Sequence, residues 1–192
     1  LFPLAGMAAG EGRSLPLLVG LRTNMLYDAI LIPNVGAEVA IGDRWAVGLD
    51  VRGAWWSGTH HHRSWRVFGC DVTGRYYLSP RDGRRLTGHH IGLYAQISTY
   101  DFKFGTTGYI GGVASRGVFN HPTVGVGAEY GYTLDVSRRV AFDFSIGVGW
   151  SGGHNEEYRT EGGHDVWQRT LNRNWFGPTR AAVSFVYYLA RD

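Results

Sequence analysis

Residues 140–150 read VAFDFSIGVGW, and every second residue from Val140 to Trp150 is apolar. The intervening positions include Asp143 and Gly147. Strict alternation over this length is the pattern of a β-strand whose two faces meet different surroundings. The stretch therefore predicts a strand with one apolar face and one polar face.

The same alternation occurs eight times from residue 18 onward, and no segment has a convincing helical period. Turn-type residues separate the repeats. The predicted strands are residues 18–28, 34–41, 45–56, 66–78, 89–100, 123–133, 140–150 and 178–189. The sequence therefore predicts an all-β fold.

Composition narrows the class of protein. The chain has 192 residues, 29 of them glycine, and a formal net charge of +3. This length suits one domain. A disulfide scaffold is excluded because Cys70 is the single cysteine, and a transmembrane helix is excluded because no run of about 18 apolar residues occurs. The basic residues are scattered without a nucleic-acid-binding motif, so we expect no nucleic-acid partner.

The two rows of residues along the predicted strands differ in charge. One row of each strand, such as Val124, Val126 and Ala128, is free of charged residues. The opposite rows hold many glycines and a set of charged residues: Arg22, Glu38, Asp50, Arg52, Asp71, Arg75, Glu129, Asp143 and Arg180. Alternation alone leaves two interpretations open, a soluble barrel with an apolar core and a membrane barrel with apolar residues facing lipid.

Three features favour the membrane barrel, in which the apolar row faces lipid. Small residues and balanced charges suit the narrow interior of an eight-stranded barrel. Aromatic residues collect near the strand ends, as in the interfacial girdles of membrane barrels. The connections at 42–44, 79–87 and 134–139 are short, whereas those at 57–65, 101–122 and 151–177 are long. The girdle residues include Trp45, Trp55, Tyr76, Tyr130, Tyr132, Trp150 and Tyr187, and further members are Tyr27, Tyr77 and Tyr188.

We therefore expect an eight-stranded antiparallel up-and-down transmembrane β-barrel over residues 18–192. An even number of strands places both termini on the short-turn side, which is periplasmic in an outer membrane. Residues 1–17 form a separate N-terminal segment in this interpretation. Because residues 1–9 read LFPLAGMAA, this segment is either a signal-peptide remnant or a periplasmic extension.

Short motifs add a family resemblance. Residues 23–27 read TNMLY, residues 32–38 read IPNVGAE and residues 42–45 read GDRW; later, 75–77 read RYY and 175–179 read WFGPT. Together these resemble a family of small Gram-negative outer-membrane barrels catalogued as a domain of unknown function. The resemblance covers most of the chain from about residue 18. It implies an outer-membrane barrel similar to the membrane part of the outer membrane protein A type, and it implies no known activity.

The sequence departs from that pattern at its last strand. The strand ends Tyr187-Tyr188-Leu189 and continues as Ala190-Arg191-Asp192, so the terminal aromatic residue of an assembly signal is displaced inward. We also find no appended peptidoglycan-binding domain. Any role in cell-wall anchoring would therefore need a partner.

The inward charges are the main candidate site. Four arginines and five acids can form an ion-pair network across a narrow lumen, because buried charges are tolerated when they are paired. The functional alternative is a gated proton or ion path through the same residues.

We expect no metal, no cofactor and no catalytic residue. His60–His62, His154 and His164 lie in predicted loops without the spacing of a metal site. The pair His62 and Ser64 is the one candidate for nucleophilic catalysis, and it lies in a loop. Cys70 faces lipid in this interpretation, where burial in apolar surroundings makes a thiol a poor nucleophile.

The leading hypothesis is a non-enzymatic outer-membrane barrel that is a structural or adaptor subunit of a larger assembly. Its recognition surface would be the long loops 101–122 and 151–177, because function concentrates on loops carried by a rigid scaffold. Expected partners are outer-membrane lipid, lipopolysaccharide and other envelope proteins. The alternatives are a lipid-modifying barrel enzyme and a soluble barrel that binds an apolar ligand.

Overall fold

A computed structural model of the chain describes residues 17–58, 63–79, 84–112, 122–162 and 164–189. These residues form nine strands and one short helix, and no described helix has the length and apolar character needed to cross a membrane. The elements are β1 (Val19–Asn24), α1 (Met25–Ala29), β2 (Asn34–Ile41), β3 (Trp45–Gly58), β4 (Arg63–Tyr77), β5 (Gly88–Phe104), β6 (Thr107–Gly111), β7 (Thr123–Asp135), β8 (Val140–Glu161) and β9 (His164–Tyr188). The predicted all-β class is confirmed.

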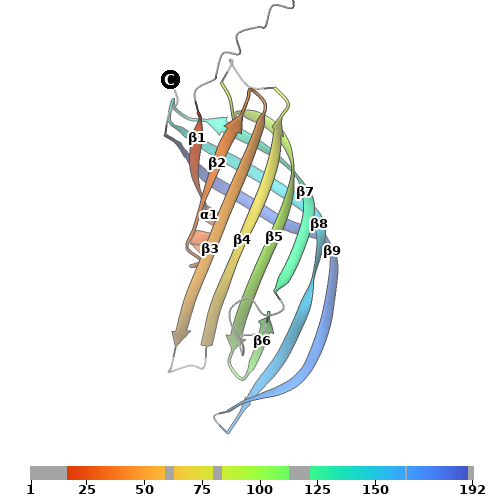
Figure 1. Cartoon of the computed structure of the whole chain (residues 1–192). Helices are drawn as coiled ribbons and strands as arrows, with labels where there is room; N and C mark the ends of the chain where they lie inside the picture. Colours follow the sequence, from red (N-terminus) through yellow and green to blue (C-terminus); the bar gives the residue numbers. More distant parts are fainter. Residues whose placement is uncertain (1–16, 59–62, 80–83, 113–121, 163, 190–192) are drawn as a thin grey trace, which may run out of the picture.

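The nine strands make one antiparallel sheet that closes on itself (Figure 1). The ring runs β1-β2-β3-β4-β5-β7-β8-β9, and β9 pairs back with β1. Residue Gly20 of β1 lies opposite Tyr188 of β9, so the start of the first strand and the end of the last share one end of the sheet. We call this the short-connection end, because the turns after β2 and β7 are also there.

The wall of the closed sheet is uneven in height. β1 has 6 residues and β2 has 8, whereas β8 has 22 and β9 has 25. β1 follows β9 only from Gly20 opposite Tyr188 to Asn24 opposite Ser184. At the opposite, long-connection end, β8 and β9 therefore run on well past the end of β1, as Figure 1 shows.

Burial alternates along the strands with the polar row inside. On β8, Asp143, Ser145 and Gly147 are buried, whereas Phe144 and Ile146, which lie between them, are exposed. Among the largest exposures of apolar side chains are 71% for Leu93 and 58% for Ile146. The outer face is thus apolar and the inner face carries the charges.

The predicted strand 18–28 is wrong beyond residue 24, because α1 begins at Met25. The Asn24 side chain accepts a hydrogen bond of 3.1 Å from the Leu26 backbone N–H, which caps this one-turn helix. Tyr27 consequently leaves the expected girdle. Its ring lies 5.3 Å from the guanidinium carbon of Arg52, a cation–π contact.

The described parts of the predicted loops 101–122 and 151–177, which exclude residues 113–121 and 163, are also largely strand. β5 continues to Phe104 and is followed by β6, a ninth strand that the sequence pattern did not predict. β8 continues to Glu161 and pairs with β9 up to the pair Glu161 and His164. We call β6 together with residues 151–161 and 164–177 the extension. On β9, residues 164–176 are exposed on both faces, so no alternation of polar and apolar residues marks this strand in the sequence.

Candidate functional site

Seven of the predicted charged residues join in one interior ion-pair network. At its centre, Arg75 lies 2.8 Å from Glu38, 2.6 Å from Glu129 and 3.4 Å from Asp143. These four residues come from β4, β2, β7 and β8, and each is 5% exposed or less. The members of this network are Arg22, Glu38, Asp50, Arg75, Glu129, Asp143 and Arg180.

The other two arginines of the network close it from the β1 and β9 side. Arg22 binds Glu38 at 2.6 Å and Asp50 at 2.5 Å. Arg180 lies 3.1 Å from Asp50 and 3.2 Å from Glu129. Each of these two arginines therefore has two carboxylate partners, as buried guanidinium groups require.

Arg52 and Asp71 form a separate buried pair, 2.7 Å apart, toward the long-connection end. All nine charged residues expected on the inner row thus have ion-pair partners, in two groups. The strand register determines this division: Arg52 lies opposite Gly69, two residues before Asp71, and its side chain reaches along β4.

Several interior polar groups were missed by the sequence analysis. His90 lies 2.7 Å from Asp143, and the Tyr77 hydroxyl donates a hydrogen bond of 2.7 Å to Glu38. The Tyr188 hydroxyl donates to the Leu86 carbonyl at 2.9 Å. The placement of Tyr77 and Tyr188 in an outer girdle is wrong, since they are 2% and 1% exposed inside the sheet. The spacing along the strand was the available signal. Tyr77 is two residues from the inward Arg75, and residues two apart on a strand share a face.

The other girdle residues lie on the outer face. Trp45, Trp55 and Tyr130 are among the most exposed of them. Trp45 contacts Tyr76 with ring centroids 4.9 Å apart, and His89 contacts Tyr132 at 4.7 Å. Of the remaining two, Trp150 lies toward the long-connection end and Tyr187 toward the short-connection end.

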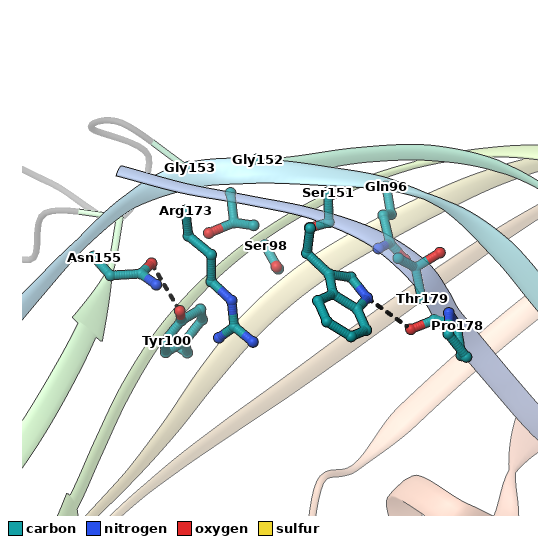
Figure 2. Close-up of a pocket in the computed structure, with 12 residues that line it drawn as sticks. Gln96, Ser98, Tyr100, Ser151, Gly152, Gly153, Asn155, Arg173, Pro178 and Thr179 are labelled. Carbon is teal, nitrogen blue, oxygen red and sulfur yellow. Dashed lines mark hydrogen bonds between the residues drawn. The ribbon is translucent and has the colours of Figure 1, made fainter. Parts of the chain in front are cut away.

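A polar cavity of about 420 Å³ lies on the inner face toward the long-connection end (Figure 2). Its lining comes from β5, β7, β8 and β9, and it includes Gln96, Ser98, Asn155 and Arg173. The Tyr100 hydroxyl, also in the lining, donates a hydrogen bond of 2.8 Å to Asn155. The Arg173 guanidinium points toward Tyr100 in Figure 2. Arginine, amides and hydroxyls in one cavity offer many hydrogen-bond donors.

A β-bulge places Arg173 in this cavity. Gly147 pairs with Arg180 and Val148 pairs with Pro178, so Thr179 is an extra residue on β9. An extra residue exchanges the two faces of a strand beyond it. Arg173 therefore faces inward opposite Gly153, although it was predicted to lie in a loop. The Thr179 hydroxyl bonds the Tyr94 hydroxyl, which separates the cavity from the ion-pair network.

The residues weighed for metal or catalytic chemistry do not converge in the described part of the chain. His60–His62 lie outside the described residues, and with them His62 of the predicted pair with Ser64. Cys70 is half-buried on β4. Within the described ranges, no group of three or more His, Cys, Asp or Glu side chains is arranged to hold a metal ion.

These features define a closed antiparallel sheet with an apolar outside, a charge-paired inside and a polar cavity. The chain matches the model of a family described as "Protein of unknown function (DUF3575)" over residues 2–189. The chain therefore belongs to this family, and the resemblance to a family of unknown function is confirmed. No curated protein and no solved structure matches it. The likeness to the outer membrane protein A type stays a prediction, since the family description names no architecture.

Proposed function

We propose that this chain is an eight-stranded transmembrane β-barrel of the outer membrane, and that it is a non-enzymatic structural or adaptor subunit of an envelope assembly. The ring β1-β2-β3-β4-β5-β7-β8-β9 would be the membrane-spanning wall. The short-connection end would face the periplasm. The start of β1 and the end of β9 lie at this end, so the chain would enter and leave the barrel on the periplasmic side. Residues 1–16, most of the predicted N-terminal segment, lie outside the described part of the chain.

The observation that carries this proposal is the inverted distribution of polarity. Leu93 and Val126 are 71% and 54% exposed on the outer face, whereas Arg75 and Asp143 are 2% and 1% exposed inside. In water, large apolar side chains favour the interior and charged side chains favour the surface. A lipid solvent reverses the preference of the outer face, and the pairing of neighbouring strands around the ring supplies backbone hydrogen bonds that lipid cannot.

The interior ion-pair network supports a plugged barrel rather than a channel. Its seven side chains extend from seven different strands into a lumen that is narrow when eight strands close. Paired charges hold one another in place and leave few free ligands for a passing ion. A gated ion path through Arg52 is the alternative. An ion path would give single-channel conductance in planar bilayers, and Arg52→Ala would change that conductance. We expect no conductance for the original protein or for Arg52→Ala.

The extension supports an adaptor role. It carries the exposed apolar residues Val166, Trp167 and Leu171 on β9, beyond the part of β9 that pairs with β1. In the proposed orientation this surface projects from the outer leaflet, where other envelope proteins and lipopolysaccharide are accessible. Trp167 and Leu171 are suitable contact residues because aromatic and aliphatic side chains anchor protein interfaces.

The membrane assignment is tested by folding the purified chain into vesicles of outer-membrane lipid. We expect heat-modifiable electrophoretic mobility in detergent, meaning that boiled and unboiled samples migrate differently. Protease should then leave the barrel strands protected in vesicles. A chain that folds in buffer without detergent and shows no heat-modifiable mobility would contradict the proposal and favour a soluble barrel with an apolar ligand.

The adaptor role is tested separately by crosslinking in the native envelope. A photoreactive residue at Trp167 should capture a defined envelope protein, whereas the same residue at Leu93 on the lipid-facing surface should capture lipid. Equal protein capture at both positions would contradict a recognition surface confined to the extension.

A further inference from the structure

The polar cavity contains a cation without an acidic partner. Among the described residues, no carboxylate forms an ion pair with Arg173, in contrast to the four arginines of the interior. The lining of the cavity holds no Asp or Glu. Arg173 interacts instead with the neutral Tyr100 side chain. A guanidinium among hydroxyl and amide groups is a suitable site for a phosphate oxygen.

The cavity lies at the level of the proposed lipid headgroups. Trp150, a girdle residue toward the long-connection end, pairs with Phe176. Gly153 lies three residues further along β8 and pairs with Arg173. Three residues of a strand advance about 10 Å. Aromatic bands mark the boundary between hydrocarbon and headgroups, so Arg173 lies just on the headgroup side of that boundary.

One side of the cavity borders an unpaired strand edge. Arg173, Trp175 and Pro178 line it from β9, and the pairing of β9 with β1 stops at Ser184. In the described part of the chain, no strand pairs with this edge of β9 over residues 164–180. Pro178 fits such an edge because proline has no N–H to donate to a neighbouring strand. A bound molecule can therefore extend sideways from the cavity into the bilayer.

The pairing of β1 with β9 ends a few residues after the cavity-lining part of β9. Asn24 donates a hydrogen bond of 3.3 Å to the Ala181 carbonyl and accepts one of 3.2 Å from the Val183 N–H. These two bonds end the seam between β1 and β9. The Thr179 and Tyr94 hydroxyls then separate the cavity from the ion-pair network. The cavity is thus bounded toward the interior network by this hydroxyl pair, and the free edge of β9 borders it on the side that would face the membrane.

We propose that this cavity binds the phosphate-bearing headgroup of an outer-leaflet lipid, with Arg173 holding the phosphate and the acyl chains leaving past the free edge of β9. The Gln96 amide and the Ser98 hydroxyl supply further hydrogen-bond donors to the same group. Trp175 lies beside the exit, with its indole N–H donating to the Pro178 carbonyl at 3.3 Å. This inference rests on the proposed outer-membrane location for the lipid source of the phosphate, for the headgroup level of the cavity and for the exit of the acyl chains.

The test is a calorimetric titration of the full chain, folded in a non-ionic detergent, with dihexanoyl phosphatidic acid, inorganic phosphate and dihexanoylglycerol. We expect phosphatidic acid to bind at least about tenfold more tightly than either of the others. Arg173→Gln should weaken that binding by about tenfold or more, because a charge-assisted hydrogen bond is lost. Arg173→Lys should retain most of it.

Arg169→Gln is the matched control. Arg169 lies on the same strand, is exposed and binds Glu157 at 2.7 Å, outside the cavity. Its replacement should leave the titration unchanged. Equal binding of inorganic phosphate and phosphatidic acid would overturn the lipid source, and equal binding of dihexanoylglycerol would overturn the phosphate site. Unchanged binding by Arg173→Gln would overturn the assignment of Arg173. Heat-modifiable mobility of each variant, measured in parallel, separates these failures from failure of the membrane proposal.

Discussion

Arg180 on β9 donates a hydrogen bond of 2.8 Å to the Thr73 hydroxyl on β4. These two strands are four places apart in either direction around the closed sheet, so the bond crosses its interior. The same guanidinium lies 3.1 Å from Asp50 on β3 and 3.2 Å from Glu129 on β7. The Arg180 side chain therefore connects β9 with β3, β4 and β7, and it occupies the space between them inside the closed sheet.

Replacing Glu38 with Gln should destabilise the protein strongly. Glu38 binds Arg22 and Arg75 at 2.6 and 2.8 Å and accepts a hydrogen bond from Tyr77. Loss of its charge leaves two buried guanidinium groups short of a partner, which costs about 3 to 5 kcal/mol. The free energy of unfolding should be measured by urea titration in lipid vesicles.

The control for this change is Arg84→Gln. Arg84 lies 3.5 Å from Asp135, and its side chain is 46% exposed. Surface pairs of this kind contribute about 0 to 1 kcal/mol. Similar decreases in the free energy of unfolding for Glu38→Gln and Arg84→Gln would show that the interior network contributes no more to stability than a surface ion pair.

Val126→Arg tests the lipid-facing surface. Val126 is 54% exposed on the outer face of β7, four residues from Tyr130. An arginine on the lipid face near the bilayer midplane costs about 2 to 4 kcal/mol. Vesicle folding titrations should show that loss. The matched change Val166→Arg, on the extension, should leave the folding free energy within about 0.5 kcal/mol of the original, and equal effects at both sites would contradict the membrane boundary.

Asn24→Ala should loosen the seam between β1 and β9. The Asn24 side chain accepts hydrogen bonds from Leu26 and Val183 and donates one to Ala181. Each bond contributes roughly 0.5 to 1.5 kcal/mol. Amide hydrogen exchange of residues 181–184 should therefore accelerate, as followed by mass spectrometry. Asn172→Ala, on the exposed part of β9, is the control, and protection that persists in Asn24→Ala would show that the seam is held by backbone pairing alone.

Tyr158→Phe should open the extension while the rest of the closed sheet persists. The Tyr158 hydroxyl donates a hydrogen bond of 2.7 Å to Asp101, and its ring lies 5.5 Å from the Lys103 ammonium group. Limited proteolysis should cut the extension of this variant faster. Tyr109→Phe, which changes an exposed ring on β6, should not alter the cleavage rate.

Alkaline pH should have the same effect as Tyr158→Phe. Burial, together with the hydrogen bond to Asp101, raises the pKa of Tyr158. A folded-state pKa above the ordinary value of about 10 means that the stabilisation is complete below that pH and is lost as the pH rises through the folded value. The extra cleavage of the extension should appear only above about pH 10. An onset at lower pH would contradict the role of Tyr158.

Much of the fold could be predicted from alternation. The predicted strand 34–41 coincides with β2, and the other predicted strands differ at one or both ends. Alternation also placed Arg22, Arg75 and Asp143 on the inner row, since a period of two assigns every residue to a face. Tyr77 and Tyr188 were misplaced because aromatic character was given more weight than their parity.

The polar cavity could not be predicted. Arg173 reaches it because the bulge at Thr179 exchanges the faces of β9, and a single inserted residue leaves no reliable mark in a one-sequence pattern. The extension was also missed, because strands with similar surroundings on both faces need not alternate. The end of β1 at Asn24 depended on a side-chain cap that competes with strand continuation.

The sequence by itself determined the strand class, the two faces and the balance of inward charges, because these depend only on neighbours along the chain. The tertiary structure decided that β1 closes onto β9, which arginine meets which acid, and where the wall stops. Those outcomes depend on the register between strands that are distant in sequence. Register determines, for instance, that Arg180 crosses to Thr73 and that Arg173 stands apart from the carboxylates of the interior.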